Sequence, residues 1–237
     1  MPAVHDHGNV HKDPVVHVPE AASSKPAKPV SKLKSHLLWP ALALFIICAL
    51  TTAALAATNA LTVEPIAQQV ALARDEARKA ALAADTFEVV DLAALKAADP
   101  DAFATALGTT PKLALAEASY GLDTAGLKTG VVVLVNTRGY ADGLSIMVGI
   151  ALDGTVSGIR ILADSETPGL GKKVADLPFL SGLLGKPTAN GFAIRKNAEG
   201  DVVPVDAVTG ATISSSAVVE AVNAAARLAG LLQKGGA

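Results

Sequence analysis

Cysteine and aromatic residues are scarce in this chain, and each scarcity excludes a class of site. Cys48 is the one cysteine among 237 residues, which excludes an intramolecular disulfide and a cysteine-based zinc or iron–sulfur site. Aromatic residues make up 3% of the chain and apolar residues 51%, so the core must be built from Ala, Val, Leu and Ile. The net charge of −2 gives no electrostatic reason to expect nucleic-acid binding.

Histidine is missing from the part of the chain that the pattern predicts to fold. All five histidines stand in the first 36 residues: His5, His7, His11, His17 and His36. Without a histidine base, hydrolysis by a serine or threonine nucleophile is disfavoured. A Gly-Lys-Ser/Thr phosphate loop in the right setting is absent as well. The sequence therefore contains no recognisable hydrolase or nucleotide-triphosphate site.

Residues 1–36 carry Pro, Lys and His without apolar periodicity, which predicts a disordered tail. Its histidines allow a weak metal-binding tract as one interpretation. The other interpretation is a solvated tail, because no cysteine or folded scaffold completes a rigid metal site. We expect the solvated cytoplasmic tail.

Residues 37–57 contain no charge and span roughly 30 Å at a helical rise of about 1.5 Å per residue, enough for one transmembrane helix. Lys25, Lys28, Lys32 and Lys34 stand shortly before this stretch, whereas Glu64 is the first charged residue after it. The positive-inside rule then places the N-terminus in the cytoplasm. We expect a single-pass protein of the bacterial inner membrane whose C-terminal part is periplasmic or otherwise extracytoplasmic.

A cleaved signal peptide is the alternative interpretation of the same stretch. The alanines around residues 54–56 would suit a signal peptidase. The apolar run is longer than a usual signal core, however, and the tail before it is long. An uncleaved anchor is therefore favoured, and either interpretation places the downstream domain outside the cytoplasm.

Residues 58–87 are predicted to form a membrane-proximal helix. After Pro65, apolar residues recur at spacings of three and four, opposite a charged face that includes Arg74 and Arg78. We expect this helix to pack on its own domain. A role at the membrane surface is the weaker alternative.

Residues 88–237 are predicted to form an α+β domain with an antiparallel sheet and packed helices. Strands are expected at residues 131–136, 144–151 and 156–163, with a further candidate at 114–120. Asp153 and Gly154 between two alternating apolar runs are a strong hairpin signal. Helices are expected over residues 91–107 and from about residue 214 onwards.

Two loops of this domain carry polar chemistry. Residues 166–173 read ETPGLGKK, in which proline and glycines define the backbone path and allow close approach to a ligand. Alone, this loop is also consistent with an ordinary turn beside two solvated lysines.

Residues 206–215 read DAVTGATISS and lead into the last helix. Free backbone N–H groups and the helix dipole at such a point favour an anion. One hydroxyl suffices to cap a helix, yet five stand here: Thr209, Thr212, Ser214, Ser215 and Ser216. The surplus indicates either a bound phosphate or a hydroxyl that is itself modified.

The motif at residues 206–212 resembles the flavinylation signature of membrane-anchored FMN-binding domains, and residues 139–174 also resemble that family. The overall pattern is similar to the G subunit of the Rnf ion-translocating electron transport complex. The C subunit of sodium-translocating NADH:quinone reductase is a near relative. The resemblance implies an FMN-binding domain anchored by one N-terminal transmembrane helix.

The resemblance also implies roles for particular residues. It places FMN covalently on Thr212 through a phosphoester bond. Other positions match the motif that a flavin transferase reads, with FAD and magnesium as its requirements: Asp206, Thr209, Gly210 and Ala211. A further set matches the flavin-contacting loop of the family: Glu166, Thr167, Leu170, Gly171 and Lys172. Many relatives have a histidine where this chain has Asp164, so no role is carried over to that position.

The function implied by the resemblance is electron transfer within an ion-translocating ferredoxin:NAD oxidoreductase complex. Its partners would be the other membrane and peripheral subunits and the flavin transferase. The chain would act as an electron carrier rather than as an enzyme on its own. The alternatives are a C-type subunit of the quinone reductase, or a membrane-anchored flavin sensor or assembly module.

Overall fold

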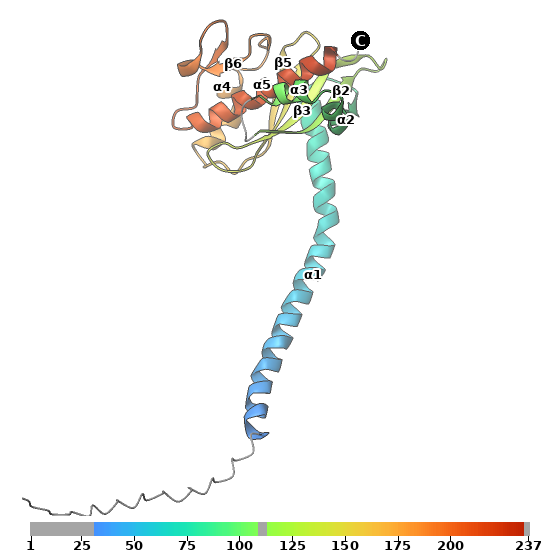
Figure 1. The fold of residues 1–237 in the computed structure, drawn as a ribbon, viewed down its shortest axis with the longest axis vertical. Helices are drawn as coiled ribbons and strands as arrows, with labels where there is room; N and C mark the ends of the chain where they lie inside the picture. Colours follow the sequence, from blue (N-terminus) through green and yellow to red (C-terminus); the bar gives the residue numbers. More distant parts are fainter. Residues whose placement is uncertain (1–30, 109–112, 235–237) are drawn as a thin grey trace, which may run out of the picture. The chain divides into compact units, whose positions relative to one another are not determined.

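A computed structural model describes residues 31–108 and 113–234, with side chains from residue 38 onwards (Figure 1). The chain divides into two compact units, Met1–Ala60 and Leu61–Ala237. Residues 1–30 lie outside the described residues, and with them lie most of the expected tail and four of its five histidines.

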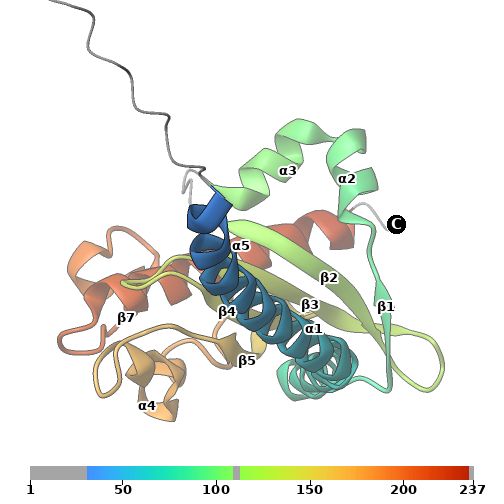
Figure 2. The same cartoon turned by 90° about the horizontal axis from the view of Figure 1, so that it is seen from below.

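The second unit contains a five-stranded antiparallel sheet whose strands follow one another in chain order. The strands are β1 (Thr86–Val89), β2 (Ala114–Leu122), β3 (Lys128–Thr137), β4 (Leu144–Ala151) and β5 (Val156–Ala163). Figure 2 shows α5 (Thr212–Lys234) running behind these strands. Sheet and helices confirm the predicted α+β class. The bounds of β4 and β5 agree with the prediction, whereas β1 was not predicted.

The helix α1 is longer than expected at both ends of the predicted transmembrane segment. It runs without a break over Ser31–Ala81, so residues 31–36 of the expected tail are helical. It also continues through Pro65, so the predicted transmembrane helix and the predicted membrane-proximal helix are one continuous helix. Alanine and leucine on both sides of the proline favour helix strongly enough to keep it intact.

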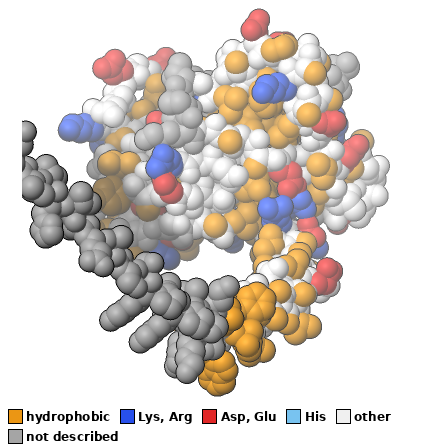
Figure 3. All heavy atoms as spheres, turned by 60° about the horizontal axis from the view of Figure 1, so that its bottom comes forward, with side chains coloured by type: hydrophobic (Ala, Val, Ile, Leu, Met, Phe, Trp, Pro, Cys, Tyr) orange, Lys and Arg blue, Asp and Glu red, His pale blue; other side chains and the backbone are white. Residues whose placement is uncertain are grey.

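The part of α1 from Leu38 onwards contains a stretch long and apolar enough to cross a membrane. Within the first unit, large apolar side chains of this helix are exposed, including Trp39 at 80% and Phe45 at 68%. Figure 3 shows apolar side chains gathered along the helical segment. Length, composition and exposure together support a membrane anchor.

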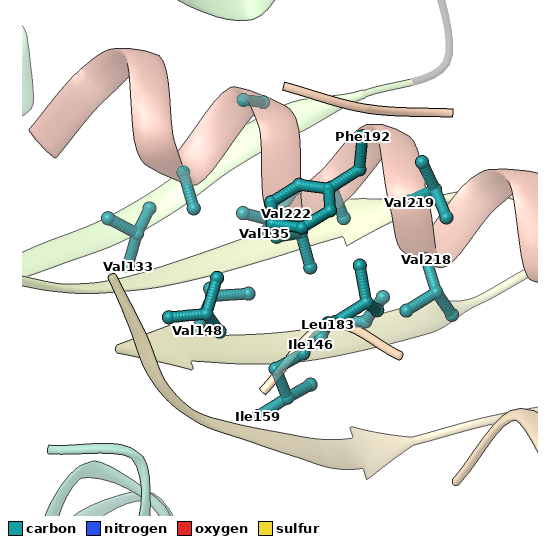
Figure 4. Packing of buried hydrophobic residues seen from close by; sticks show 14 of the residues in the cluster. Val133, Val135, Ile146, Val148, Ile159, Leu183, Phe192, Val218, Val219 and Val222 are labelled. Atoms are coloured by element: carbon teal, nitrogen blue, oxygen red, sulfur yellow. The ribbon is translucent and has the colours of Figure 1, made fainter. Parts of the chain in front are cut away.

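Strand β3 is buried on both of its faces, because each face of the sheet is covered. Val133 and Val135 pack in the core on the α5 side, while Val132 and Leu134 pack against the end of α1. Successive side chains of a strand point to opposite faces, so this alternation produces the unbroken apolar run in β3. Figure 4 shows Val133 and Val135 in the core beneath α5.

The last turn of α1 packs closely on strands β4 and β5. The Ser157 hydroxyl donates a 2.7 Å hydrogen bond to the Ala81 carbonyl. Gly149 and Gly158 lie beneath Ala81, and a Cβ at either position would collide with its backbone. Arg78 forms an ion pair with Glu117 of β2. The expected packing of this helix on its own domain is thus confined to its last residues.

The helical region predicted at 91–107 is two short helices, α2 (Leu92–Ala98) and α3 (Pro100–Leu107). Proline at position 100 cannot supply an N–H to a continuing helix, so it begins a new one. The Asp99 side chain accepts a 2.9 Å hydrogen bond from the Ala102 N–H and caps the second helix.

The chain between the sheet and α5 forms small elements that the sequence did not predict. They are η1 (Gly171–Ala175), α4 (Leu177–Leu180), β6 (Phe192–Ile194), η2 (Arg195–Asn197) and β7 (Val203–Val205). β6 and β7 pair in parallel. The Asn223 side chain of α5 exchanges two 2.8 Å hydrogen bonds with the Phe192 backbone and holds this pair against the helix. This packing fixes the position of the residues that follow β7 and lead into α5.

Candidate flavin-binding site

A pocket of about 560 Å³ lies where three separate chain segments meet at the start of α5. Its lining residues are Tyr140, Glu166, Thr167, Leu170, Gly171, Gly210, Ala211, Thr212, Ile213 and Ser214. The segments are the turn after β3, the loop after β5 and the first turn of α5 with its preceding loop. The volume is typical of a pocket for a small organic ligand.

A buried carboxylate joins the three segments. Glu166 is 2% exposed and Ser214 is 0% exposed. The Ser214 hydroxyl donates a 2.7 Å hydrogen bond to Glu166 Oε2, and the Ala141 N–H donates one of 3.3 Å to Oε1. A Cβ at Gly139 or Gly171 would collide with this carboxyl group. The two glycines are therefore needed to make room for Glu166.

The loop after β5 turns sharply at Gly169. The Leu170 N–H donates a 3.2 Å hydrogen bond to the Thr167 carbonyl, and Gly169 has φ of +77°. Proline at position 168 followed by glycine with positive φ is the arrangement of a type II turn. The turn places Leu170, 47% exposed, in the wall of the pocket.

The loop before α5 contains a second turn with glycine at the corresponding place. The Ala211 N–H donates a 2.9 Å hydrogen bond to the Val208 carbonyl, and Gly210 has φ of +79°. The first backbone bond of α5 runs from Ser215 to Ala211 at 2.9 Å. The N–H groups between these two residues have no acceptor within the helix, and they give this end of the pocket a positive character.

The five hydroxyls near this helix start have different environments. Ser214 and Ser215 are buried and hydrogen-bonded: Ser214 donates to a carboxylate, and Ser215 Oγ accepts a backbone N–H at 3.0 Å. Thr209 is exposed and Ser216 half-buried, and neither lines the pocket. Thr212 is exposed and lines the pocket. Of the five hydroxyls, Thr212 alone is exposed to solvent and also belongs to the residue at which α5 begins.

Most residues predicted for the site come together, but three of them do not line the pocket: Lys172, Asp206 and Thr209. Lys172 Nζ lies 3.2 Å from Asp164 Oδ1 in an ion pair. Asp206 forms an ion pair with Arg195 of η2, in which one guanidinium N–H lies 3.0 Å from Oδ2. The hydrogen bond from Arg195 lowers the pKa of Asp206. This pair fastens the start of the loop to the neighbouring element.

The prediction missed three pocket residues, Tyr140, Ile213 and Ser214. Tyr140 comes from a different loop, and nothing local in the sequence connects it to the other two loops. Ile213 is 58% exposed, an apolar side chain on the first turn of an otherwise amphipathic helix. An apolar residue outside the apolar face of the helix was the one signal in the sequence that could have indicated a ligand contact at Ile213. Ser214 was noticed as a hydroxyl, but its partner Glu166 stands 48 positions away.

A larger cavity of about 840 Å³ lies between α3, the segment before β6 and the second half of α5. It contains none of the predicted site residues. Arg227 in its wall donates a 3.1 Å hydrogen bond to the Ala106 carbonyl at the end of α3, and burial lowers the pKa of this arginine. Within residues 31–108 and 113–234, no group of three or more His, Cys, Asp or Glu side chains could hold a metal ion.

The C-terminal half of the chain matches a known domain family. The family described as FMN-binding domain matches residues 139–227, a range that contains every residue lining the smaller pocket. The second unit therefore contains an FMN-binding domain.

Comparison with curated proteins gives the family. The chain is 32% identical to the G subunit of the Na(+)-translocating ferredoxin:NAD(+) oxidoreductase complex of Acetobacterium woodii, over 77% of this chain and 86% of that protein. It is 35% identical to the G subunit of the ion-translocating oxidoreductase complex of Methanosarcina acetivorans, over 44% of this chain and 54% of that one. The match to the G subunit of the corresponding Vibrio cholerae complex, at 44% identity, covers 37% and 43%. The chain belongs to the family of G subunits of ion-translocating oxidoreductase complexes.

A solved structure with a similar course of the chain is the crystal structure of Shewanella oneidensis NqrC. It covers 65% of this chain and 91% of its own, with a TM-score of 0.43 and 23% sequence identity. The family assignment rests on the sequence relatives.

The residues of the smaller pocket fit FMN. Exposed apolar side chains of Leu170 and Ile213 stand at its wall, and Tyr140, 73% exposed, adds an aromatic ring. The start of α5 supplies unpaired N–H groups that suit a phosphate. Thr212 supplies a hydroxyl at the same place. An apolar wall beside an anion-binding helix end matches the two halves of this cofactor.

Proposed function

We propose that this chain carries FMN bound through a phosphoester to Thr212 and transfers electrons as the G subunit of a Rnf-type ion-translocating oxidoreductase. The observation that carries the proposal is the position of Thr212. Its side chain is exposed, lines the pocket and stands at the start of α5, whereas Ser214 and Ser215 are buried and engaged. A phosphate on Thr212 would meet the unpaired N–H groups of the first turn.

Attachment requires a flavin transferase that uses FAD and magnesium. The Thr212 oxygen forms a bond to the phosphorus on the FMN side of FAD. The pyrophosphate bond breaks and AMP is the leaving group. The proton of the threonine hydroxyl passes to a base of the transferase. Thr209 and Gly210 are exposed just before Thr212, where the transferase can reach them. Asp206 is held by Arg195, and Ala211 ends the turn at Gly210. These four residues would present the threonine for modification.

Bound FMN supplies one- and two-electron transfer. The chain supplies the place and the surroundings. Glu166, Thr167, Leu170 and Gly171 form one wall of the pocket, and Lys172 stands behind them in its ion pair with Asp164. The glycines of both turns let the backbone approach a planar ligand closely. Covalent attachment keeps the flavin at a high effective concentration near its pocket, whereas a reversibly bound flavin outside the cytoplasm would diffuse away after dissociation.

The proposed arrangement is that of a single-pass inner-membrane protein. Residues 37–57 would span the membrane with the tail, residues 1–36, in the cytoplasm. Residues 58–87 would lead to the FMN-binding domain at 88–237 on the outer side. One helix cannot form an ion path, so ion movement would belong to other membrane subunits of the complex. The chain would then be an electron carrier of the assembly and not an enzyme on its own.

Intact mass tests the attachment. We expect the detergent-extracted wild-type chain, co-expressed with a flavin transferase, to gain the mass of FMN minus water. Thr212→Ala should lose the gain, and Ser216→Ala should keep it, because Ser216 is a hydroxyl of the same helix outside the pocket. An unmodified wild-type chain beside a flavinylated reference protein contradicts the proposal.

Co-purification tests the assembly. We expect a tagged chain in mild detergent to bring down integral membrane subunits that carry redox cofactors. If the flavinylated chain is extracted at its native level and comes down alone, the assignment to such a complex is wrong.

A further inference from the structure

One charged side chain stands in the wall of the flavin pocket. Of the residues that line it, Glu166 alone is charged. Within the part of the chain that the structure describes, Glu166 is also the one charged side chain that is buried. A charge removed from water acts over a longer distance and more strongly than one on the surface, because less solvent screens it. The ligand in this pocket would experience its field directly.

The positive charge of Lys172, on the same loop, is not offered to this pocket. Lys172 is absent from the lining and lies 3.2 Å from Asp164, so its charge is already paired. The structure places Glu166 in the pocket wall and Lys172 outside it.

The hydrogen bonds of Glu166 suit its ionised form. Both carboxyl oxygens accept: Oε2 from the Ser214 hydroxyl at 2.7 Å and Oε1 from the Ala141 N–H at 3.3 Å. An ionised carboxylate is an acceptor at both oxygens, which matches this pair of donors. Ser214 also stands in the first turn of α5, where the helix dipole favours negative charge. The carboxyl group is therefore fixed in place in the wall of the pocket.

We propose that Glu166 lowers the reduction potential of the FMN bound in this pocket. The inference rests on the proposed function. An electron arriving on the flavin adds negative charge, and a fixed carboxylate in the pocket wall opposes that addition. Glu166 is thus a tuning residue: it acts through its field and takes no proton or electron in the reaction.

The test compares the oxidised–reduced equilibrium of FMN in three variants at pH 8. Glu166→Gln keeps the size of the side chain and one of its two acceptor oxygens, and it removes the charge. We expect it to shift the equilibrium toward reduced flavin about tenfold, equivalent to about 30 mV upward for a two-electron couple. Glu88→Gln removes an exposed charge from edge strand β1 and should leave the equilibrium unchanged.

Ser214→Ala separates electrostatics from general damage. It keeps the carboxylate and removes the hydroxyl that partly neutralises it, so the field in the pocket grows and the equilibrium should shift toward oxidised flavin. Disturbance of the pocket alone would move both variants in the same direction. If Glu166→Gln does not fold, the direction of the Ser214→Ala shift decides the question. A Glu166→Gln value within twofold of wild type, or a Ser214→Ala shift toward reduced flavin, overturns the proposal.

Failure of this inference is distinguishable from failure of the proposed attachment. Intact mass reports first whether the chain carries linked FMN. Linked flavin is titrated spectroscopically against reference dyes. In a chain without linked flavin, the dissociation constants of oxidised and reduced free FMN are measured. By linkage, their ratio gives the effect of the pocket on the oxidised–reduced equilibrium. The attachment is judged by mass and the role of Glu166 by this ratio.

Discussion

Ser214 on the first turn of α5 donates a 2.7 Å hydrogen bond to Glu166 on the loop after β5, 48 positions earlier in the chain. The bond connects the two loops in which the sequence predicted ligand-binding residues, at residues 166–173 and 206–215. It brings the loop at residues 166–173 against the helix that begins at Thr212. The shape of the pocket depends on this contact.

Removal of the Ser214 hydroxyl should destabilise the folded domain. Ser214→Ala leaves a buried carboxylate oxygen without its donor, which typically costs about 1–3 kcal/mol. Denaturant unfolding of the full chain in detergent, followed by circular dichroism, measures the change. Ser216→Ala, outside the pocket, is the matched control and should change the free energy of unfolding by about 0.5 kcal/mol or less. Equal effects of the two variants would contradict the importance of the bond.

Gly171 should not tolerate a side chain. A Cβ there would collide with the Glu166 carboxyl group, so Gly171→Ala must push the carboxylate away from Ser214. Overpacking of this kind typically costs about 1–3 kcal/mol. Gly230→Ala is the control, because a Cβ at that position in α5 meets no atom within 4 Å. It should stabilise the domain by about 0.5–1 kcal/mol through helix propensity. A stabilising Gly171→Ala would show that the packing around Glu166 is looser than described.

The Asp206–Arg195 pair should give a pH-dependent contribution to stability. Hydrogen bonding to Arg195 lowers the pKa of Asp206 in the folded chain below its ordinary value, near 3.9. The contribution is therefore present above that value and disappears as the pH falls through the lower folded pKa. Thermal unfolding of wild type and Asp206→Asn between pH 6 and 2 measures it. The difference between them should shrink below about pH 3.9; a difference that stays constant across this range would contradict the account.

Ile213 should matter for the flavin and not for folding. It is 58% exposed and lines the pocket, so Ile213→Ser removes apolar surface that only a ligand would cover. We expect the unfolding temperature of the flavin-free chain to stay close to wild type. The additional stability conferred by FMN should fall by about 1–2 kcal/mol. Leu177→Ser, at a 69% exposed position outside the pocket, is the control and should leave the flavin contribution unchanged.

The central strands could be predicted because their signals are local. Alternating apolar residues on both sides of Asp153 and Gly154 define β4 and β5 to the residue. Strand β1 could not be predicted: its four residues are mostly exposed, and it exists because it pairs with β2 at the edge of the sheet. The continuity of α1 through Pro65 was missed because a proline ordinarily interrupts a helix.

The candidate site could be predicted in part for the same reason. Each loop has a local signature of proline, glycine and hydroxyl residues, which marked Glu166 and a group of five hydroxyls. The resemblance to membrane-anchored FMN-binding domains then pointed to Thr212 among them. Their joining through Ser214 is a contact between distant positions, and no spacing in the sequence encodes it. The ion pairs that hold Lys172 and Asp206 outside the pocket lining are likewise visible only in three dimensions.

Peptide mapping tests the place of FMN attachment most directly. Digestion with trypsin should release residues 197–227 as one peptide, because Lys196 precedes it, Arg227 ends it and no Lys or Arg lies between. All five candidate hydroxyls are in this peptide. Fragmentation of the peptide from chains co-expressed with a flavin transferase should place the FMN mass on Thr212. FMN on another hydroxyl, or an unmodified peptide beside a flavinylated reference protein, would contradict the account.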